Sequence, residues 1–300
     1  MPNTIVDLHL HTYYSDGRAS PAEILHHAAA IGLKTVAITD HDNINAAEEA
    51  EIVAKKLGLE LIPAVEITST WKDCVSCYEP GFTNQDVDIL GYFIDRRSPA
   101  LVAFCKAAMA DFTSRISDCC TYLQKSGYPL SIYDVLDENP RFPGDIQVIQ
   151  ALLHRRLARD FRQASSLFLE AFQNVRPSST TVEQAIQIIH AAGGAAVLAH
   201  PVIINGGKGR LTRDDLQELI MLGLDGIEVY HPRLDSEAQA YYRHLAEEYN
   251  LCISGGSDEH GGRDRFTRLG SQLVTYEMVA ELRERARRRQ DQSLGKNKHR

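Results

Sequence analysis

The sequence predicts an α/β fold organised around a parallel sheet or barrel. The chain has 300 residues, and 44% of them are hydrophobic, which is enough to build a large buried core. Short runs rich in Val, Ile and Leu alternate along the chain with amphipathic segments of helical period. Continuous apolar strands that alternate with helices are typical of parallel sheets, because helices cover both faces of such sheets.

Seven segments have the pattern of buried strands. They are residues 4–11, 35–41, 60–67, 87–94, 194–200, 225–231 and 251–260. Amphipathic helices are expected at residues 20–31, 46–57, 181–192 and 236–249, and several of them end at a glycine placed as a C-cap. The alternation predicts that the strands share one sheet or barrel and point the same way.

The alternation breaks once, between about residues 98 and 177. Helical segments at 102–126 and 146–173 follow each other there without a strand, and residues 136–145 form the expected loop between them. We therefore divide the chain into a barrel (1–97 and 178–280) and a helical insertion (98–177) that covers the active site. The basic residues 281–300 are expected to fray from a helix into a disordered tail, with weak contact to anionic partners as the alternative.

Composition argues against several classes of protein. The 32 Lys and Arg residues against 40 Asp and Glu residues give a net charge of -8, which disfavours a binder of duplex DNA, although a local basic groove stays open. The chain shows no signal peptide and no apolar run that could span a membrane, so a cytoplasmic protein without membrane contact is expected. Cys74 and Cys77 lack a second pair at zinc-finger spacing, so reduced, non-catalytic thiols are expected.

Side chains that can bind metals lie in or near the end of every predicted strand. They are His9, His11, Asp40, His41, Glu66, Asp88, His200, Glu228, His231, Asp258 and His260. His9 and His11 are two residues apart on a strand and project to the same side, so both can bind one ion. A lone strand-end histidine is usually a hydrogen-bonded surface group, and residues 39–42 (TDHD) alone could be a capped turn. Here all seven strand ends carry such side chains, and the ends share one face of a barrel. This convergence predicts a metal centre rather than unrelated surface groups.

The types of ligand narrow the metal and the chemistry. Histidine nitrogen and carboxylate oxygen suit Mn²⁺, Zn²⁺ or Fe²⁺ better than Ca²⁺. About nine candidate ligands, at roughly three to five per ion, require two or three ions in one site, with Glu66 as the natural bridge. Ions held about 3.5–4 Å apart generate a bridging hydroxide and clamp the oxygens of an in-line displacement, which is the chemistry of phosphate ester hydrolysis.

Four motifs carry a family resemblance: DLHLHTYYSDG at 7–17, ITDHD at 38–42, VLAHP at 197–201 and GGSDEHG at 255–261. With them the chain resembles the polymerase and histidinol phosphatase (PHP) family of metal-dependent phosphoesterases. Its bacterial nucleotide phosphoesterases and short-RNA exonucleases are the most similar subgroup. The resemblance implies a distorted seven-stranded (β/α)7 TIM-like barrel, the PHP fold, with a helical insertion after the fourth strand.

The resemblance also implies a trinuclear site. The first ion would be bound by His9, His11, Glu66 and Asp258. The second would be bound by Glu66, His200 and the residue at position 88. The third would be bound by Asp16, His41 and His260. The family usually has a histidine where this chain has Asp88, so the ligand set of the second ion differs. Asp40 is expected to orient His41 or to cap the following helix rather than to bind metal.

Substrate contacts are expected from cationic groups near the strand ends, because phosphoryl transfer depends on positioning and on charge stabilisation. The candidates are Arg18, Lys208, Arg210, His231 and Arg233. For each of them, a solvated loop charge is the alternative. His231 directly follows a strand and is expected to bind the phosphate or to protonate the leaving oxygen, and Asp16 and His260 complete the expected catalytic groups.

We expect a metal-dependent phosphoesterase that acts on a small phosphate ester, with a nucleotide or nucleoside bisphosphate phosphomonoester as the leading substrate. Hydrolysis of a cyclic sugar phosphate diester, or 5′–3′ trimming of short RNA, is the runner-up. An inactive metal-binding module and a hydrolase of non-phosphate substrates are alternatives from other classes.

The chain departs from the subgroup that it resembles at three positions expected to contact substrate. The subgroup often has Arg and His where this chain has Asp145 and Gln147, and a His where it has Asp235.

Overall fold

Seven strands form one sheet in sequence order, which curls into a nearly closed barrel. The computed structural model describes residues 5–71, 86–175, 180–201, 211–262 and 268–297, with side chains as far as residue 291. The strands are β1 (Val6–Asp7), β2 (Thr35–Ile38), β3 (Glu60–Thr70), β4 (Asp86–Tyr92), β5 (Ala195–Leu198), β6 (Gly226–Tyr230) and β7 (Cys252–Gly255). The segments after β1 and β7 close the ring, since the amide of Asp258 donates to the carbonyl of His9 at 2.9 Å. The predicted α/β barrel is confirmed.

One strand runs against its neighbours, so the expectation that all strands point the same way is wrong. β4 is antiparallel to both β3 and β5, whereas the other neighbouring pairs are parallel. An antiparallel neighbour needs no crossover helix, and residues 72–85, which connect β3 to β4, lie outside the described residues. Asp88 pairs with Thr68 near the end of β3, so the start of β4 lies at the face where the parallel strands end.

Ten helices surround the barrel or build the insertion among the described residues. They are α1 (Pro21–Ala30), α2 (Ala47–Leu57), α3 (Pro99–Lys125), α4 (Ile132–Glu138), α5 (Asp145–His154), α6 (Phe161–Gln173), α7 (Val182–Ala191), α8 (Arg213–Leu222), α9 (Ser236–Glu248) and α10 (Tyr276–Asn297). Capping boxes begin several of them, as at Ser20 and Thr181. α4 occupies part of the segment expected to be a loop, and Ser131 and Asp134 form its capping box. None of the described helices is both long and apolar enough to cross a membrane.

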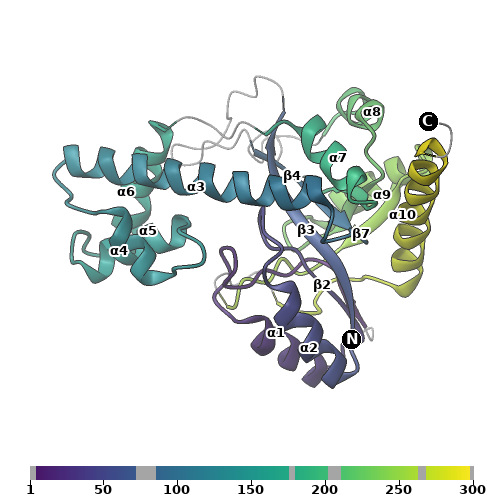
Figure 1. Cartoon of the computed structure of the whole chain (residues 1–300), viewed down its shortest axis with the longest axis horizontal. Coiled ribbons are helices and arrows are strands. Elements are labelled where there is room, and N and C mark those ends of the chain that lie inside the picture. Colours follow the sequence, from purple (N-terminus) through teal and green to yellow (C-terminus); the bar gives the residue numbers. More distant parts are fainter. Residues whose placement is uncertain (1–4, 72–85, 176–179, 202–210, 263–267, 298–300) are drawn as a thin grey trace.

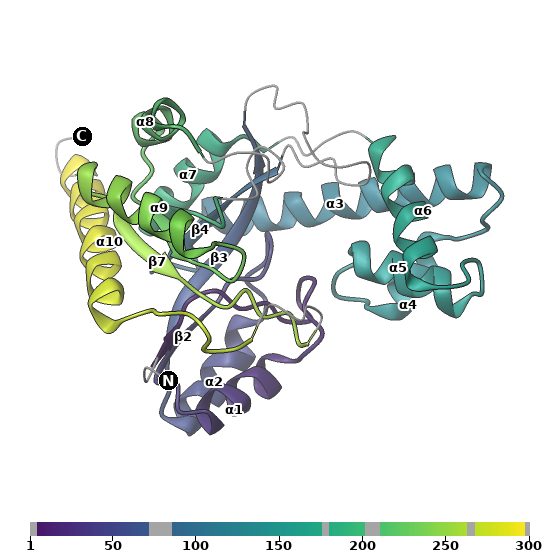
Figure 2. The same cartoon turned by 180° about the vertical axis from the view of Figure 1, so that it is seen from behind.

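The insertion comprises α3 to α6 and has a core of its own. Figure 1 shows α3 extending from the barrel to a group formed by α4, α5 and α6, and the view from behind places this group at the same side of the barrel (Figure 2). Ile116, Leu123, Leu152 and Phe168 are buried together within it. That the insertion covers the active site stays a prediction.

The basic end of the chain, expected to fray from a helix into a disordered tail, is helical as far as Asn297 in α10. Val279, Leu282 and Ala286, spaced three and four residues apart, are buried in the same cluster as the apolar side chains of the barrel strands. Arg289 donates to the buried carboxylate of Asp225 at 2.8 Å. The apolar stripe is hidden in the sequence by the surrounding arginines, and the barrel that it contacts stabilises the helix.

Replacing Leu282 by alanine is expected to lower the free energy of unfolding by about 2–5 kcal/mol, because the side chain is fully buried and leaves a cavity. Urea denaturation followed by circular dichroism measures the loss. Leu273→Ala is the control, since Leu273 is 51% exposed and should shift the midpoint little. Equal midpoints for the two variants would contradict the docking of α10.

The described cysteines are free thiols with no catalytic environment. They are Cys105, Cys119, Cys120 and Cys252. Burial raises the pKa of the Cys119 thiol to about 12 and that of Cys120 to about 11, so neither is a ready thiolate nucleophile. Cys74 and Cys77 lie outside the described residues.

Candidate metal centre

The structure brings all nine expected metal ligands into one cluster at the end of the barrel. They are His9, His11 and Asp16 after β1, His41 after β2, Glu66 in β3, Asp88 in β4, His200 after β5, and Asp258 and His260 after β7. Glu66 does not end its strand, because β3 continues to Thr70. The cluster divides into three groups of side chains, and Glu66 belongs to two of them.

The innermost group has the spacing of a filled metal site. His9 Nε2 and His11 Nε2 lie 3.1 Å apart, and each lies 3.1 Å from Glu66 Oε2. Asp258 Oδ1 lies 3.4 Å from His9 Nε2 and 3.2 Å from His11 Nε2. Ligands at about 2.0–2.1 Å from a tetrahedral ion are about 3.3 Å from one another. The atoms of His9, His11 and Glu66 can therefore hold one divalent ion with little movement, and Asp258 lies beside both imidazoles as a further ligand.

A second group forms on the other oxygen of Glu66. His200 Nε2 lies 3.0 Å from Glu66 Oε1 and 3.7 Å from Asp88 Oδ2. Asp88 Oδ1 is buried without a hydrogen bond, which is costly for a carboxylate unless a cation completes the site. Because Glu66 presents one oxygen to each group, it has the geometry of a bridging ligand.

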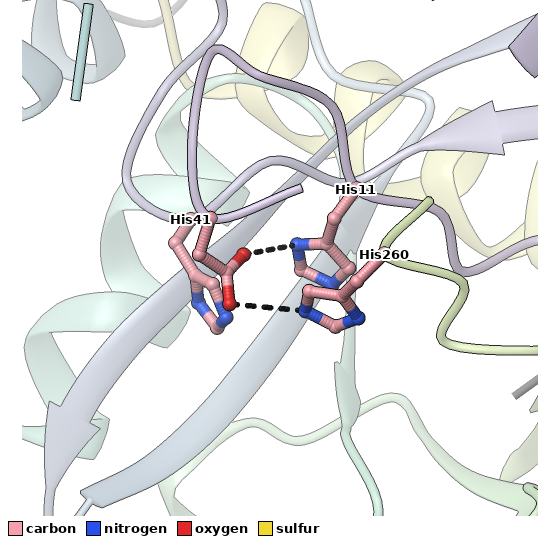
Figure 3. A group of neighbouring side chains, drawn as sticks. His11, His41 and His260 are labelled. Carbon is pink, nitrogen blue, oxygen red and sulfur yellow. Dashed lines mark ion pairs between the residues drawn. The ribbon is translucent and has the colours of Figure 1, made fainter. Parts of the chain in front are cut away.

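The third group is nearer the surface and consists of His11, Asp16, His41 and His260. Asp16 Oδ2 lies 3.0 Å from His260 Nε2, and Asp16 Oδ1 lies 3.4 Å from His11 Nδ1, which makes no hydrogen bond. Figure 3 shows the imidazoles of His11 and His260 beside each other and facing His41, and the first two rings are stacked at 4.2 Å. His11 thus offers one ring nitrogen to the inner group and one to this group.

Local backbone geometry explains parts of the motifs. A Cβ atom on Gly256 would lie 2.3 Å from Cβ of His9, and one on Gly17 would lie 2.5 Å from a backbone oxygen of its own loop, so both positions require glycine. His200 and Asp258 have φ angles of +24° and +53°. Such angles cost a non-glycine residue on the order of 1–3 kcal/mol and are typical of functional sites.

Glu228 supports the cluster from behind. Its Oε1 accepts from His9 Nδ1 at 3.0 Å, and its Oε2 accepts from the backbone amide of His200 at 2.8 Å. A proton on His9 Nδ1 leaves the Nε2 lone pair directed into the cluster, as a metal ligand requires. Glu228 is therefore a positioning carboxylate, although its place in the strand pattern is that of a ligand.

Replacing Glu228 by glutamine is expected to weaken metal binding by about 10–100-fold, because the amide no longer fixes the tautomer and orientation of His9. Calorimetric titration of metal-free protein with Zn²⁺ measures the change. Glu51→Gln is the matched control, since Glu51 is exposed on α2 and pairs with Arg96. Unchanged affinity in the Glu228 variant would contradict the assigned role.

Asp40 does not act as the sequence suggests. It accepts from the amide of Thr12 at 2.7 Å, from the Thr12 hydroxyl at 2.7 Å and from the Ser15 hydroxyl at 2.6 Å. His41 Nδ1 instead lies 3.2 Å from the hydroxyl of Thr68, and α2 begins after Ala46. Asp40 therefore shapes the loop that carries Asp16, which is a long-range role that sequence proximity to His41 conceals.

Asp7 is a supporting residue that sequence reasoning missed. Its carboxylate accepts from the amide of Ser257 at 2.9 Å and from that of Gly270 at 2.8 Å. Burial raises the pKa of Asp7 to about 6 against these hydrogen bonds. Asp7 thus ties β1 to the segment that carries Asp258. The pattern DLHLH points to a buried carboxylate, but its partners lie about 250 residues away.

Charge inside the cluster is balanced by its own groups. Burial lowers the pKa of His9, but the carboxylates of Glu66, Glu228 and Asp258 outweigh burial and hold that pKa well above 6.5. Burial likewise raises the pKa of Glu66, yet the neighbouring imidazoles, His9 first, hold it well below 4.5. Glu66 is thus ionised, whereas burial and the neighbouring charge of Glu66 raise the pKa of Asp88. Divalent cations can replace the protons on the imidazoles.

The expected substrate-binding residues are placed unequally. Arg18 is exposed, and its amide donates to the carbonyl of His260 at 3.1 Å, which puts it beside the third group. Arg233 is exposed, and its amide donates to His231 Nδ1 at 3.2 Å. His231 itself is buried, with Nε2 3.3 Å from Asp258 Oδ2. Lys208 and Arg210 lie outside the described residues.

Two departures from the family pattern are explained by helix capping. Gln147 is buried, and its side chain accepts from the amide of Gly144 at the start of α5. Asp235 accepts from the amide of Ala238 at 2.8 Å at the start of α9. Both side chains are therefore engaged in capping.

Comparison with known proteins agrees with this geometry. The family model of the PHP domain matches residues 7–183. The chain belongs to the PHP domain family. This PHP protein is 31% identical to a 5′-3′ exoribonuclease of Haemophilus influenzae over 261 residues, 85% of this chain and 89% of that one. It is 28% identical to a 3′,5′-nucleoside bisphosphate phosphatase of Chromobacterium violaceum over 86% of this chain and 90% of the relative.

A third relative and a solved structure extend the likeness. The phosphoribosyl 1,2-cyclic phosphate 1,2-diphosphodiesterase of Eggerthella lenta is 27% identical over 89% of this PHP protein and 98% of the relative. A crystal structure from Bifidobacterium adolescentis, assigned to the metal-dependent phosphoesterases, superposes with a TM-score of 0.80 at 27% identity and covers 94% of this chain and 96% of that one. Family, relatives and cluster together identify the protein as a metal-dependent phosphoesterase.

Proposed function

We propose that this PHP protein removes a phosphate from a nucleotide or nucleoside bisphosphate, using two or three ions among Mn²⁺, Zn²⁺ and Fe²⁺. The observation that carries the proposal is Glu66, which presents one carboxylate oxygen to the His9–His11–Asp258 group and the other to His200. The named activity of the Chromobacterium violaceum relative supports this substrate class.

The residues present fit divalent ions. Mixed imidazole and carboxylate donors suit these metals, and two buried atoms of the cluster have no hydrogen bond: Asp88 Oδ1 in the second group and His11 Nδ1 in the third. Bound ions would supply an activated water and positive charge for the phosphoryl oxygens. Glu66 and Asp258 would hold an ion through the inner group, and Glu228 keeps the His9 ring in its ligand orientation.

His231 holds a proton at the edge of the inner group. Its Nδ1 accepts from the amide of Arg233, so the proton of the neutral ring is on Nε2 and is directed at Asp258. Burial lowers the pKa of His231, which favours this neutral form. From Nε2 the neutral ring can donate a hydrogen bond to a phosphoryl oxygen that lies beside Asp258 and so bind the phosphate. Protonation of the leaving oxygen would require the imidazolium form of the ring. Arg18, exposed beside the third group, would neutralise phosphate charge.

Trimming of short RNA from its 5′ end is the second candidate. The exoribonuclease relative has a higher identity, 31%, than the bisphosphate phosphatase relative, 28%. Hydrolysis of a terminal diester uses the same centre but requires room for a second nucleotide. Location in the cytoplasm and exclusion of duplex DNA stay predictions.

A substrate panel tests the proposal. Protein reconstituted with Mn²⁺ is assayed for phosphate release from nucleoside 3′,5′-bisphosphates and nucleotides, for opening of cyclic sugar phosphates, and for trimming of 5′-phosphorylated short RNA. Fastest turnover of the bisphosphate is expected, and its loss in His11→Ala but not in His27→Ala, a histidine exposed on α1, ties turnover to the cluster. Faster trimming of RNA favours the second candidate. No metal-dependent turnover of any ester would reject both.

Asp88 is expected to hold an ion despite the usual histidine of the family. Metal analysis should find equal content in wild type and Asp88→His, and about one ion fewer per chain in Asp88→Ala, because Asp88 is the carboxylate beside His200. Asp95→Ala is the control, since Asp95 is exposed. More metal ions per chain in Asp88→His than in wild type would show that the ion site beside His200 stays empty when residue 88 is aspartate.

A further inference from the structure

The loop between β1 and α1, residues 12–17, carries Asp16 and has its own set of anchors. On the barrel side, Asp40 holds Thr12 and Ser15, and the side-chain amide of Asn43 donates to the carbonyl of Tyr14 at 2.6 Å. These contacts come from elements adjacent to the loop in the barrel. The Tyr13 hydroxyl donates to Glu49 of α2 at 3.0 Å, whereas the carbonyl of Tyr13 accepts from a residue of the insertion.

The insertion reaches this loop with the turn that follows α4. The side-chain amide of Asn139 donates to the carbonyl of Tyr13 at 2.8 Å, and Asn139 is 8% exposed. Its Oδ1 accepts from the amide of Arg141 at 3.0 Å, which fixes the direction of the side chain. The Arg141 guanidinium lies 4.4 Å from the ring centre of Tyr13 and 5.6 Å from that of Tyr14.

We propose that Asn139 and Arg141 are positioning residues through which the helical insertion sets the place of Asp16 in the third ligand group. This inference rests on the proposed metal centre. Tyr13 lies between His11 and Asp16, so a hydrogen bond to its carbonyl and a cation over its ring restrain the chain between two ligand residues. Ligands on a loop need such outer supports to hold their geometry.

The assignment gives the insertion a role in ion binding besides any contact with substrate. The outer group includes the residue on the 12–17 loop, Asp16, whereas Glu66 and Asp88 of the other groups lie on strands of the barrel. We call the contacts of Asn139 and Arg141 with Tyr13 the clamp. Loss of the clamp should therefore weaken the binding of the ion at Asp16 selectively. The ion between His9, His11, Glu66 and Asp258 should be unaffected.

Titration of metal-free protein with Mn²⁺, with free Mn²⁺ counted by electron paramagnetic resonance, tests the clamp. In Asn139→Ala one class of bound Mn²⁺ should dissociate about ten-fold more readily, with the tighter class unchanged. Arg141→Ala should act in the same direction by a smaller factor. Asn174→Ala is the matched control, because its side-chain amide donates to the carbonyl of Glu170 at 2.8 Å within the insertion, away from the loop.

A double-variant cycle separates positioning from a general effect on stability. Asp16→Ala should lack the weaker class of Mn²⁺, and adding Asn139→Ala to it should change the remaining affinity less than two-fold. Equal titrations of Asn139→Ala and Asn174→Ala, or a ten-fold loss that persists in the Asp16→Ala background, would overturn the clamp. If Asn139→Ala does not fold, the Mn²⁺ titration of Arg141→Ala replaces it, because Arg141 is exposed. A titration of Arg141→Ala equal to that of Asn174→Ala would then overturn the clamp. Wild-type protein that binds no Mn²⁺ would instead reject the metal centre itself.

Discussion

Replacing Glu66 by glutamine is expected to lower kcat/KM for phosphate ester hydrolysis by about a thousand-fold or more and to remove at least one bound ion per chain. Glu66 Oε2 lies 3.1 Å from both His9 Nε2 and His11 Nε2, and Oε1 lies 3.0 Å from His200 Nε2. An amide has the same shape but carries no charge and offers a single acceptor oxygen, so it can serve only one of the two groups.

Metal analysis and steady-state kinetics on the same preparations measure this effect. Glu60→Gln is the matched control, since Glu60 begins the same strand, is partly exposed and pairs with Arg283. It should keep full metal content and turnover within about two-fold, as surface changes usually do. A Glu66→Gln enzyme with wild-type metal content and turnover would remove the bridging carboxylate from the mechanism.

The metal-free protein is expected to lose stability as the pH rises above about 6.5, by on the order of 5 °C in Tm. Burial lowers the pKa values of His9 and His11, but the surrounding carboxylates raise them well above 6.5. Groups with a raised folded pKa contribute stability that is complete below the unfolded value and lost as the pH passes the folded value. Deprotonated imidazoles leave Glu66 and Asp258 as buried, uncompensated charges.

Thermal melts of metal-free and Mn²⁺-loaded protein across this range test the prediction. The Tm of the Mn²⁺-loaded protein should fall little as the pH rises, because the bound ions compensate the buried carboxylates in place of the protons on the imidazoles. Calorimetry in buffers of different ionisation enthalpy should show that binding releases protons. His27→Ala, on the exposed face of α1, should keep the fall of the wild type. A Tm of the metal-free protein that rises with pH would contradict the charge balance of the cluster.

Most of the site was readable from the chain because its ligands follow a rule of local position. In a barrel the strand ends share one face, so His9, His11, His200 and Asp258 could be grouped without a structure. Their supports could not be grouped in this way. Asp7 and Asp40 are held by residues that no periodic pattern connects to them. The docking of helix α10 was not predicted for a similar reason, because its apolar side chains pack against a barrel formed by distant segments.

The sequence by itself determined the alternation of strands and helices, the run of consecutive helices after β4 and the residues proposed as metal ligands, since each of these depends on local period or on position within a motif. Only the tertiary structure decided the reversed direction of β4, by which Asp88 faces the cluster from the start of its strand. It also decided the contact of Glu228 with His9, 219 residues apart, and that of Asn139 with Tyr13. Such contacts depend on how distant segments pack, which local preference does not encode.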